Sequence, residues 1–167
     1  HSHAKTVVDA TATSSSREDA ADSTVTIGAS AEAFGLAALS GDDKLSNLGA
    51  EGSPAPTISA VAEVEGTALA TYDETHQDTS TATSAASALA MGVSAGDGVN
   101  LVENGGEVSA SATALADTRA EANTDLTWTT RTVANPYAAA LAAGISSGSG
   151  NDRVETGKNS TTSATAK

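Results

Sequence analysis

Hydrophobic and polar residues alternate with a period of two along several stretches of this 167-residue chain. Residues 57–64, 108–114 and 160–166 bring Ala, Val or Ile to one set of alternate positions and mainly Ser, Thr or Glu to the other. Alternate side chains of a β-strand point to opposite faces, so this pattern predicts strands with one buried face. Residues 28–34 and 83–91 are runs of small residues that we also interpret as strands.

The arrangement recurs three times. Gly35, Gly92 and Gly144 lie 57 and 52 residues apart, and each is followed six residues later by a second glycine that opens a turn-like segment. A repeat of this size cannot bury its apolar face alone, but stacked repeats can. We therefore expect an all-β fold, a β-solenoid of the β-helix or β-roll type. It would have about three repeats of 52–57 residues, with Ala/Ser/Thr-rich strands and corners made of Gly and Asp or Asn.

We expect one repeat domain that covers residues 1–167. Within it the pattern predicts a terminal strand segment (1–25), a first repeat (26–80), a second repeat (81–127) and a third repeat (128–167). The start of the chain resembles the last strand of an earlier repeat. The first residue is His1 instead of Met, which indicates a removed leader or a segment cut from a longer chain.

Two alternatives compete with this fold. Residues 135–144 are typical of a short helix, because Ala is the best helix former and Asn135, Pro136 and Gly144 stand where a cap, a first turn and an end belong. The equivalent residues 28–34 alternate like a strand, which favours the β interpretation. Disorder is the second alternative, since more than half of the hydrophobic residues are Ala. The scarcity of Pro and the regular spacing of Val, Ile and Leu favour order.

The charge of the chain restricts its partners. It has 8 basic and 21 acidic residues, a net charge of −13 and a pI near 4.3. Such a surface repels nucleic acid and anionic membranes, so we expect no nucleic-acid partner. No stretch approaches the roughly 18 apolar residues of a membrane span, so we expect no membrane insertion. The acidity and the absence of Cys fit an extracellular or cell-surface protein that is secreted.

One corner comes close to a known metal motif. Residues 148–154 read Gly-Ser-Gly-Asn-Asp-Arg-Val, and residues 41–45 contain the second half of the same pattern. This resembles the nonapeptide of the repeats-in-toxin family, in which stacked loops bind Ca²⁺ and the aliphatic residue points into a β-roll. The resemblance implies calcium ligands at four residues. They are Asp42, Asp43, Asn151 and Asp152.

The calcium hypothesis has a metal-free alternative. The family uses tandem nonapeptides, whereas this chain has the motif once per repeat, and its middle copy has Val99 and Asn100 where aspartate belongs. Plain corners without metal are therefore the competing interpretation. No cofactor is required by the sequence, and Ca²⁺ is the one candidate.

Other candidate chemistry is sparse. His1 and His3 could chelate Cu²⁺ if His1 is a free terminus, and a flexible polar end is the alternative. His76 lies in a charged segment without a second histidine cluster, and no serine lies in a nucleophile motif, so we expect no enzymatic activity. The four aromatic side chains are scattered and indicate packing. They are Phe34, Tyr72, Trp128 and Tyr137.

The pattern as a whole resembles long repetitive proteins secreted by bacteria, such as surface adhesins, stalks and filament subunits. Both ends of the chain are β-prone, and exposed strand edges pair with other chains. The leading hypothesis is therefore a structural, non-enzymatic protein that assembles head to tail with copies of itself into a filament. A stalk segment of a large secreted adhesin and a calcium-dependent secreted β-roll protein are the alternatives.

Overall fold

The computed structural model describes residues 2–16, 23–73, 79–123 and 131–167, and all regular elements among them are β-strands. The prediction of an all-β chain is confirmed. The strands form three sheets of parallel strands: sheet A (β1-β4-β7-β10), sheet B (β2-β5-β8) and a short sheet (β3-β6-β9). Their bounds are β1 (Ser2–Ser16), β2 (Ser23–Ala37), β3 (Lys44–Asn47), β4 (Thr57–Asp73), β5 (Thr79–Ser94), β6 (Leu101–Asn104), β7 (Glu107–Asn123), β8 (Arg131–Ser146), β9 (Arg153–Thr156) and β10 (Thr161–Ala166).

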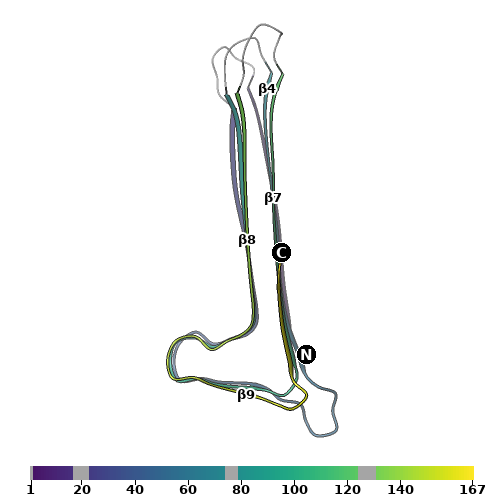
Figure 1. The fold of residues 1–167 in the computed structure, drawn as a ribbon, viewed down its shortest axis with the longest axis vertical. Helices are drawn as coiled ribbons and strands as arrows, with labels where there is room; N and C mark the ends of the chain where they lie inside the picture. The colour runs from purple at the N-terminus through teal and green to yellow at the C-terminus, as the bar shows by residue number, and fades with distance from the viewer. Residues whose placement is uncertain (1, 17–22, 74–78, 124–130) are drawn as a thin grey trace.

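Consecutive strands lie in different sheets, and strands one repeat apart lie side by side (Figure 1). We call each set of three consecutive strands a rung: β2–β4 is the first, β5–β7 the second and β8–β10 the third. In sheet B, Ser30 pairs with Ser87, and Ser87 pairs with Ala139. Partners in sheet B and the short sheet are thus separated by 57 and then by 52 residues. These are also the spacings of the repeated glycines, so the sequence repeat sets the register of these two sheets.

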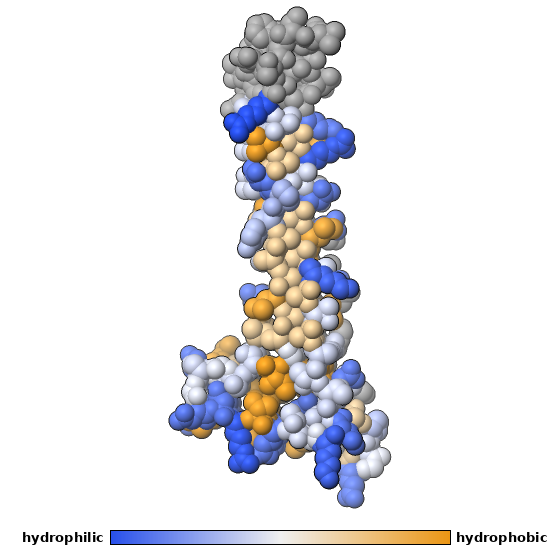
Figure 2. Space-filling model, viewed as in Figure 1, coloured by the Kyte–Doolittle hydropathy of each residue, from blue (hydrophilic) through white to orange (hydrophobic). Residues whose placement is uncertain are grey.

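Sheets A and B face each other along the long axis of the molecule (Figure 1), and their inner side chains are mostly Ala. Figure 2 shows that weakly hydrophobic residues also cover much of the surface of this straight part. The strands of one sheet pack between strands of the other, since β5 contacts both β4 and β7. Alanine buries little area per residue, so this layer depends on close approach of the backbones and on its length. The main cluster is Ala29, Ala31, Ala33, Ala60, Ala62, Val64, Ala86, Ala88, Ala90, Ala110, Ala112 and Ala114.

Two glycines shape the corner of each rung. A Cβ atom on Gly92 would collide with the side chain of Val108 and with the carbonyl of Gly144, so only glycine fits at this position near the end of β5. The second glycine adopts the left-handed conformation that other residues avoid. Its φ angle is 118° at Gly41, 138° at Gly98 and 133° at Gly150.

Each corner also contains a strand that the sequence pattern does not predict. The four-residue strands β3, β6 and β9 pair with one another and form the foot of the molecule in Figure 1. Larger side chains fill this wider region. The buried cluster there is Leu45, Ile58, Val93, Ala95, Val102 and Val108.

The helical alternative for residues 135–144 is wrong, because these residues lie within β8. Strand β8 is at the edge of sheet B, where the missing N–H of Pro136 is tolerated. Pairing with β5 over fifteen positions outweighs the helix propensity of the alanines. In the described part of the chain there is no helix long and apolar enough to cross a membrane.

Candidate functional site

The corners align Asp43, Asn100 and Asp152, each two residues after the left-handed glycine of its rung. The amide N–H of Asp43 donates to Oδ1 of Asn100 at 3.1 Å. The amide N–H of Asn100 donates to Oδ1 of Asp152 at 3.0 Å. We call this column the corner ladder: in each step the backbone of one rung donates to the side chain of the next.

Asn100 is the centre of the corner ladder and is only 2% exposed. Its side-chain Nδ2 donates to Oδ1 of Asp152 at 3.0 Å and to the carbonyl of Gly96 at 2.8 Å. An aspartate at this position would bring a second carboxylate next to Asp152 and would remove the side-chain donor that Asn100 supplies to it. The amide therefore supplies the positive end of a dipole where a calcium loop would use a cation.

The four predicted calcium ligands do not come together. Asp42 and Asp43 lie on the first rung, and Asn151 and Asp152 lie on the third, with a full rung between the pairs. Two strand spacings are about 10 Å, whereas the ligand oxygens of one Ca²⁺ lie about 2.3–2.6 Å from the ion. The Asp42 carboxylate instead accepts from the amide of Val99 at 2.9 Å. No group of three or more His, Cys, Asp or Glu side chains that could hold a metal was found among the described residues.

A second polar column lies at the other end of the short sheet. Nδ2 of Asn47 donates to Oδ1 of Asn104 at 2.8 Å, and the amide of Gly106 donates to the same oxygen at 3.2 Å. Asn104 is 1% exposed, and its own Nδ2 has no hydrogen-bond partner among the described residues. The third rung has Thr156 at this position, so the asparagine column spans the first two rungs and does not continue to the third.

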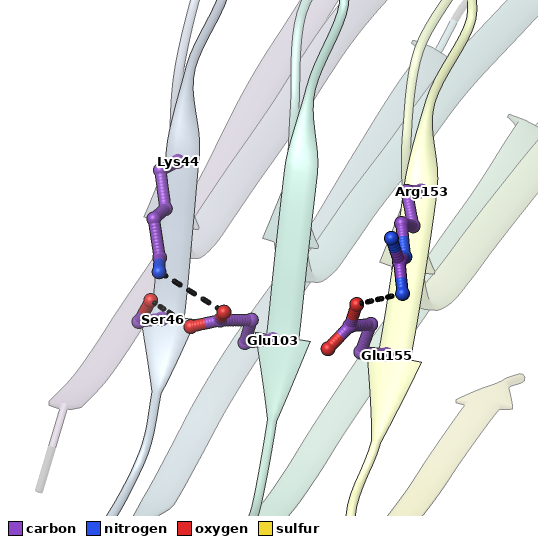
Figure 3. Close-up of polar contacts among 5 residues, drawn as sticks. All are labelled: Lys44, Ser46, Glu103, Arg153 and Glu155. Carbon is purple, nitrogen blue, oxygen red and sulfur yellow. Dashed lines mark hydrogen bonds and ion pairs between the residues drawn. The ribbon is translucent and has the colours of Figure 1, made fainter.

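Charged residues line the outer side of the short sheet (Figure 3). Nζ of Lys44 lies 3.0 Å from Oε1 of Glu103, and the hydroxyl of Ser46 donates to Oε2 at 2.9 Å. These contacts, first of all the one with Lys44, hold the pKa of Glu103 below its usual value. On the third rung Arg153 pairs with Glu155 of its own strand at 2.6 Å. Each carboxylate thus has a cation beside it, although Glu103 and Glu155 are register partners.

The third rung leaves inner positions open that the other rungs bury. Leu45, Val102 and Val154 occupy one column and are 8%, 1% and 45% exposed. In sheet A, β10 pairs with only the first six residues of β7 and ends partway along it (Figure 1). The third rung therefore has an unpaired edge in all three sheets and a partly uncovered apolar layer.

The outer face of sheet B has two shallow hollows of about 310 and 270 Å³. Gly28, Ala85 and Tyr137 line the first, and Glu32, Leu89 and Leu141 line the second. Glu32 is the one carboxylate among their lining residues.

The histidine hypotheses fall largely outside the described residues. His1 and His76 are not among them, and neither is Trp128. The backbone of His3 lies in β1 and pairs with Ser59 of β4. The copper hypothesis is therefore untested by the structure and stays a prediction.

Sequence reasoning missed the roles of Asn47, Asn100 and Asn104. The signal was in the repeat itself. Asn47 and Asn104 both lie twelve residues after the first glycine of their repeat, and Asn100 lies eight residues after Gly92, as Asp43 lies eight after Gly35. A buried column of amides at a repeated position is typical of side-chain ladders between stacked strands.

Comparison of this chain with models of protein families, with curated proteins and with solved structures gives no match.

Proposed function

We propose that this chain is a structural, non-enzymatic protein that folds as a β-solenoid and assembles head to tail into an extracellular filament. One observation carries the proposal: three parallel sheets stack their strands in the same direction, and the first and last strands leave open edges. An open edge has unpaired N–H and C=O groups that pair readily with another chain. Contacts that repeat without closing a ring give a filament.

The use of the buried polar side chains supports a structural role. The hydroxyls of Ser80 and Ser84 donate to the carbonyls of Ala70 and Gly66, at 3.0 and 2.5 Å, and so join sheet B to sheet A. Asn100 joins neighbouring corners in the same way. These buried side-chain donors bond to the backbone or to another rung, as a scaffold requires, and Nδ2 of Asn104 is the exception among the described residues.

The surface composition supports an extracellular location. The outward positions of the strands are mostly Ser, Thr and acidic residues, and the chain has no Cys that would depend on redox conditions. A net charge of −13 would keep such a rod soluble and would limit lateral association. Association through the strand edges would then be the preferred contact between copies.

A stalk segment of a large secreted adhesin is the second candidate. The same open edges favour it, because the preceding and following parts of a longer chain would cover them by continuing the sheets. In that case the 167-residue chain would extend a binding module that lies elsewhere.

Assembly of the purified chain distinguishes the two candidates. We expect sedimentation velocity to show species far heavier than 16.3 kDa as the concentration rises, and electron microscopy to show unbranched fibres. Fibre diffraction should give a reflection near 4.8 Å along the fibre axis, because the strands lie across that axis. A chain that stays at 16.3 kDa at millimolar concentration would favour the stalk.

A further inference from the structure

We infer that the third rung binds the first rung of a second copy in the register that the rungs already use within one chain. The inference rests on the proposed head-to-tail assembly and names its interface. In this joint β8 pairs with β2 of the second copy, and β9 pairs with β3. Continuing the register of Ser30, Ser87 and Ala139 places Ser30 of the second copy beside Ala139.

The two ends of the corner ladder are complementary. Within the chain, the amide N–H of Asp43 donates to the side chain of Asn100, and that of Asn100 donates to the side chain of Asp152. In the described part of the chain, neither the Asp152 amide N–H nor the Asp43 carboxylate has a partner. The next step of the ladder is therefore a bond from Asp152 to Asp43 of a second copy, with charge assistance from the carboxylate.

The charges of the two end rungs are also complementary. Residues 131–167 carry four basic and two acidic residues, whereas residues 23–73 carry seven acidic residues and one basic. The chain as a whole is strongly acidic, so a basic third rung stands out against its background. Opposite signs favour joining a third rung to a first rung over joining two first rungs or two third rungs.

Strand β1 has the position that sheet A needs at the joint. Ser2 pairs with Ile58 and Thr162 pairs with Val108, and Ile58 and Val108 pair with each other, so Ser2 and Thr162 hold equivalent places. Strand β10 fills only the first part of that place beside β7. The backbone of residues 8–16 from a second copy would fill the rest, as in strand complementation. Residues 2–6 of the second copy and residues 162–166 of the first copy would occupy the same place in sheet A. One of these two segments is therefore displaced when the copies join.

The joint also covers the open apolar layer of the third rung. Val154, at the third-rung end of its column, is 45% exposed, whereas Leu45 and Val102 of the same column are buried. Leu45 of a second copy would continue that column above Val154. The contact thus buries the same kind of side chain that each existing rung contact buries.

Cysteine pairs test the register, because the chain has no cysteine of its own. The variant S30C/A139C should form disulfides between copies and give a ladder of covalent oligomers on a non-reducing gel. Within one copy these two residues lie two strand spacings apart, about 10 Å, which exceeds the roughly 4.4–6.8 Å between Cα atoms of a disulfide. The variant S30C/S87C is the internal control and should cross-link within the monomer.

An off-register pair makes the result specific. The variant T26C/A139C shifts one cysteine by four residues, about 13 Å along the strand, and should not cross-link. Fibres that form without the S30C/A139C bond would overturn this interface and leave the filament proposal intact. Cross-linked dimers that do not grow would support the interface and overturn the filament. A protein that remains monomeric would overturn both.

The ladder contact has its own test. The variant D43A keeps the backbone groups through which Asp43 bonds within the chain, and it removes only the open carboxylate. We expect it to raise the concentration for half-maximal assembly about tenfold, as for the loss of one charge-assisted hydrogen bond. The matched variant E107A removes an exposed carboxylate from β7 of the second rung, away from both end rungs, and should change that concentration less than about twofold. Equal effects of the two variants would overturn the ladder contact.

Discussion

The straight part of the molecule and the corner bury their residues in different ways. In the straight part, sheets A and B enclose a layer of Ala, and the hydroxyls of Ser80 and Ser84 join the two sheets. The corner has larger aliphatic residues together with buried Asn47, Asn100 and Asn104. The straight part therefore depends on small volume, and the corner depends on specific hydrogen bonds. The two regions should respond to different substitutions.

Enlarging a residue of the alanine layer should have the largest effect. Ala90 is fully buried between the sheets, and the variant A90L would force them apart over several residues. We expect a loss of about 3 kcal/mol in the free energy of unfolding, measured by urea denaturation with circular dichroism. The control A139L adds the same atoms to the outer face of β8 and should change stability by less than about 0.5 kcal/mol. Similar losses for both variants would contradict the thin-layer account.

Changing the amide of the corner ladder should have the next largest effect. The variant N100D removes the donor to Gly96 and Asp152 and adds a like charge beside Asp152, so we expect a loss of about 2 kcal/mol. The urea concentration at the midpoint of unfolding should also be measured for each protein in Ca²⁺ and in EDTA. The wild type should have the same midpoint in both. A midpoint that EDTA lowers in the wild type would show that calcium, not Asn100, stabilises the corner.

Extending the asparagine column should stabilise the corner by a smaller amount. The variant T156N offers Oδ1 to the unpaired Nδ2 of Asn104, and we expect a gain of about 1 kcal/mol in the free energy of unfolding. The variant T156V has nearly the shape of threonine without a new acceptor, so it should give no gain. A thermal melt of the three proteins side by side makes the comparison.

Acid should weaken the charged contacts of the corner by the smallest amount. The pKa of Glu103 is lowered in the folded chain, so its ionised form stabilises the fold above the unfolded pKa of about 4.3. That contribution is lost as the pH falls through the folded pKa. Between pH 6 and 3 the stability of the E103Q variant should therefore fall less steeply than that of the wild type. Equal slopes for the wild type and E103Q would contradict the account.

Much of the fold follows from the period of the sequence. The alternation in residues 57–64 and 108–114 predicts β4 and β7, and the spacing of Gly35 and Gly92 equals the pairing offset of sheet B. The short strands could not be predicted in this way. Strand β3, for example, has four residues with one buried aliphatic, Leu45, which is too short to show a period. These strands form because the stacking of the longer ones aligns the corners.

The sequence by itself determined the β class and the register of sheet B and the short sheet, because a period of two sets which face is buried and a repeat spacing sets which residues meet. Only the tertiary structure decided the chemistry of the corners. It turned Asn100 from a defect in a calcium motif into the centre of a hydrogen-bonded column, and it left Nδ2 of Asn104 without a partner above Thr156. Bonds between residues 57 or 52 positions apart exist only after the rungs have stacked. No local pattern contains them.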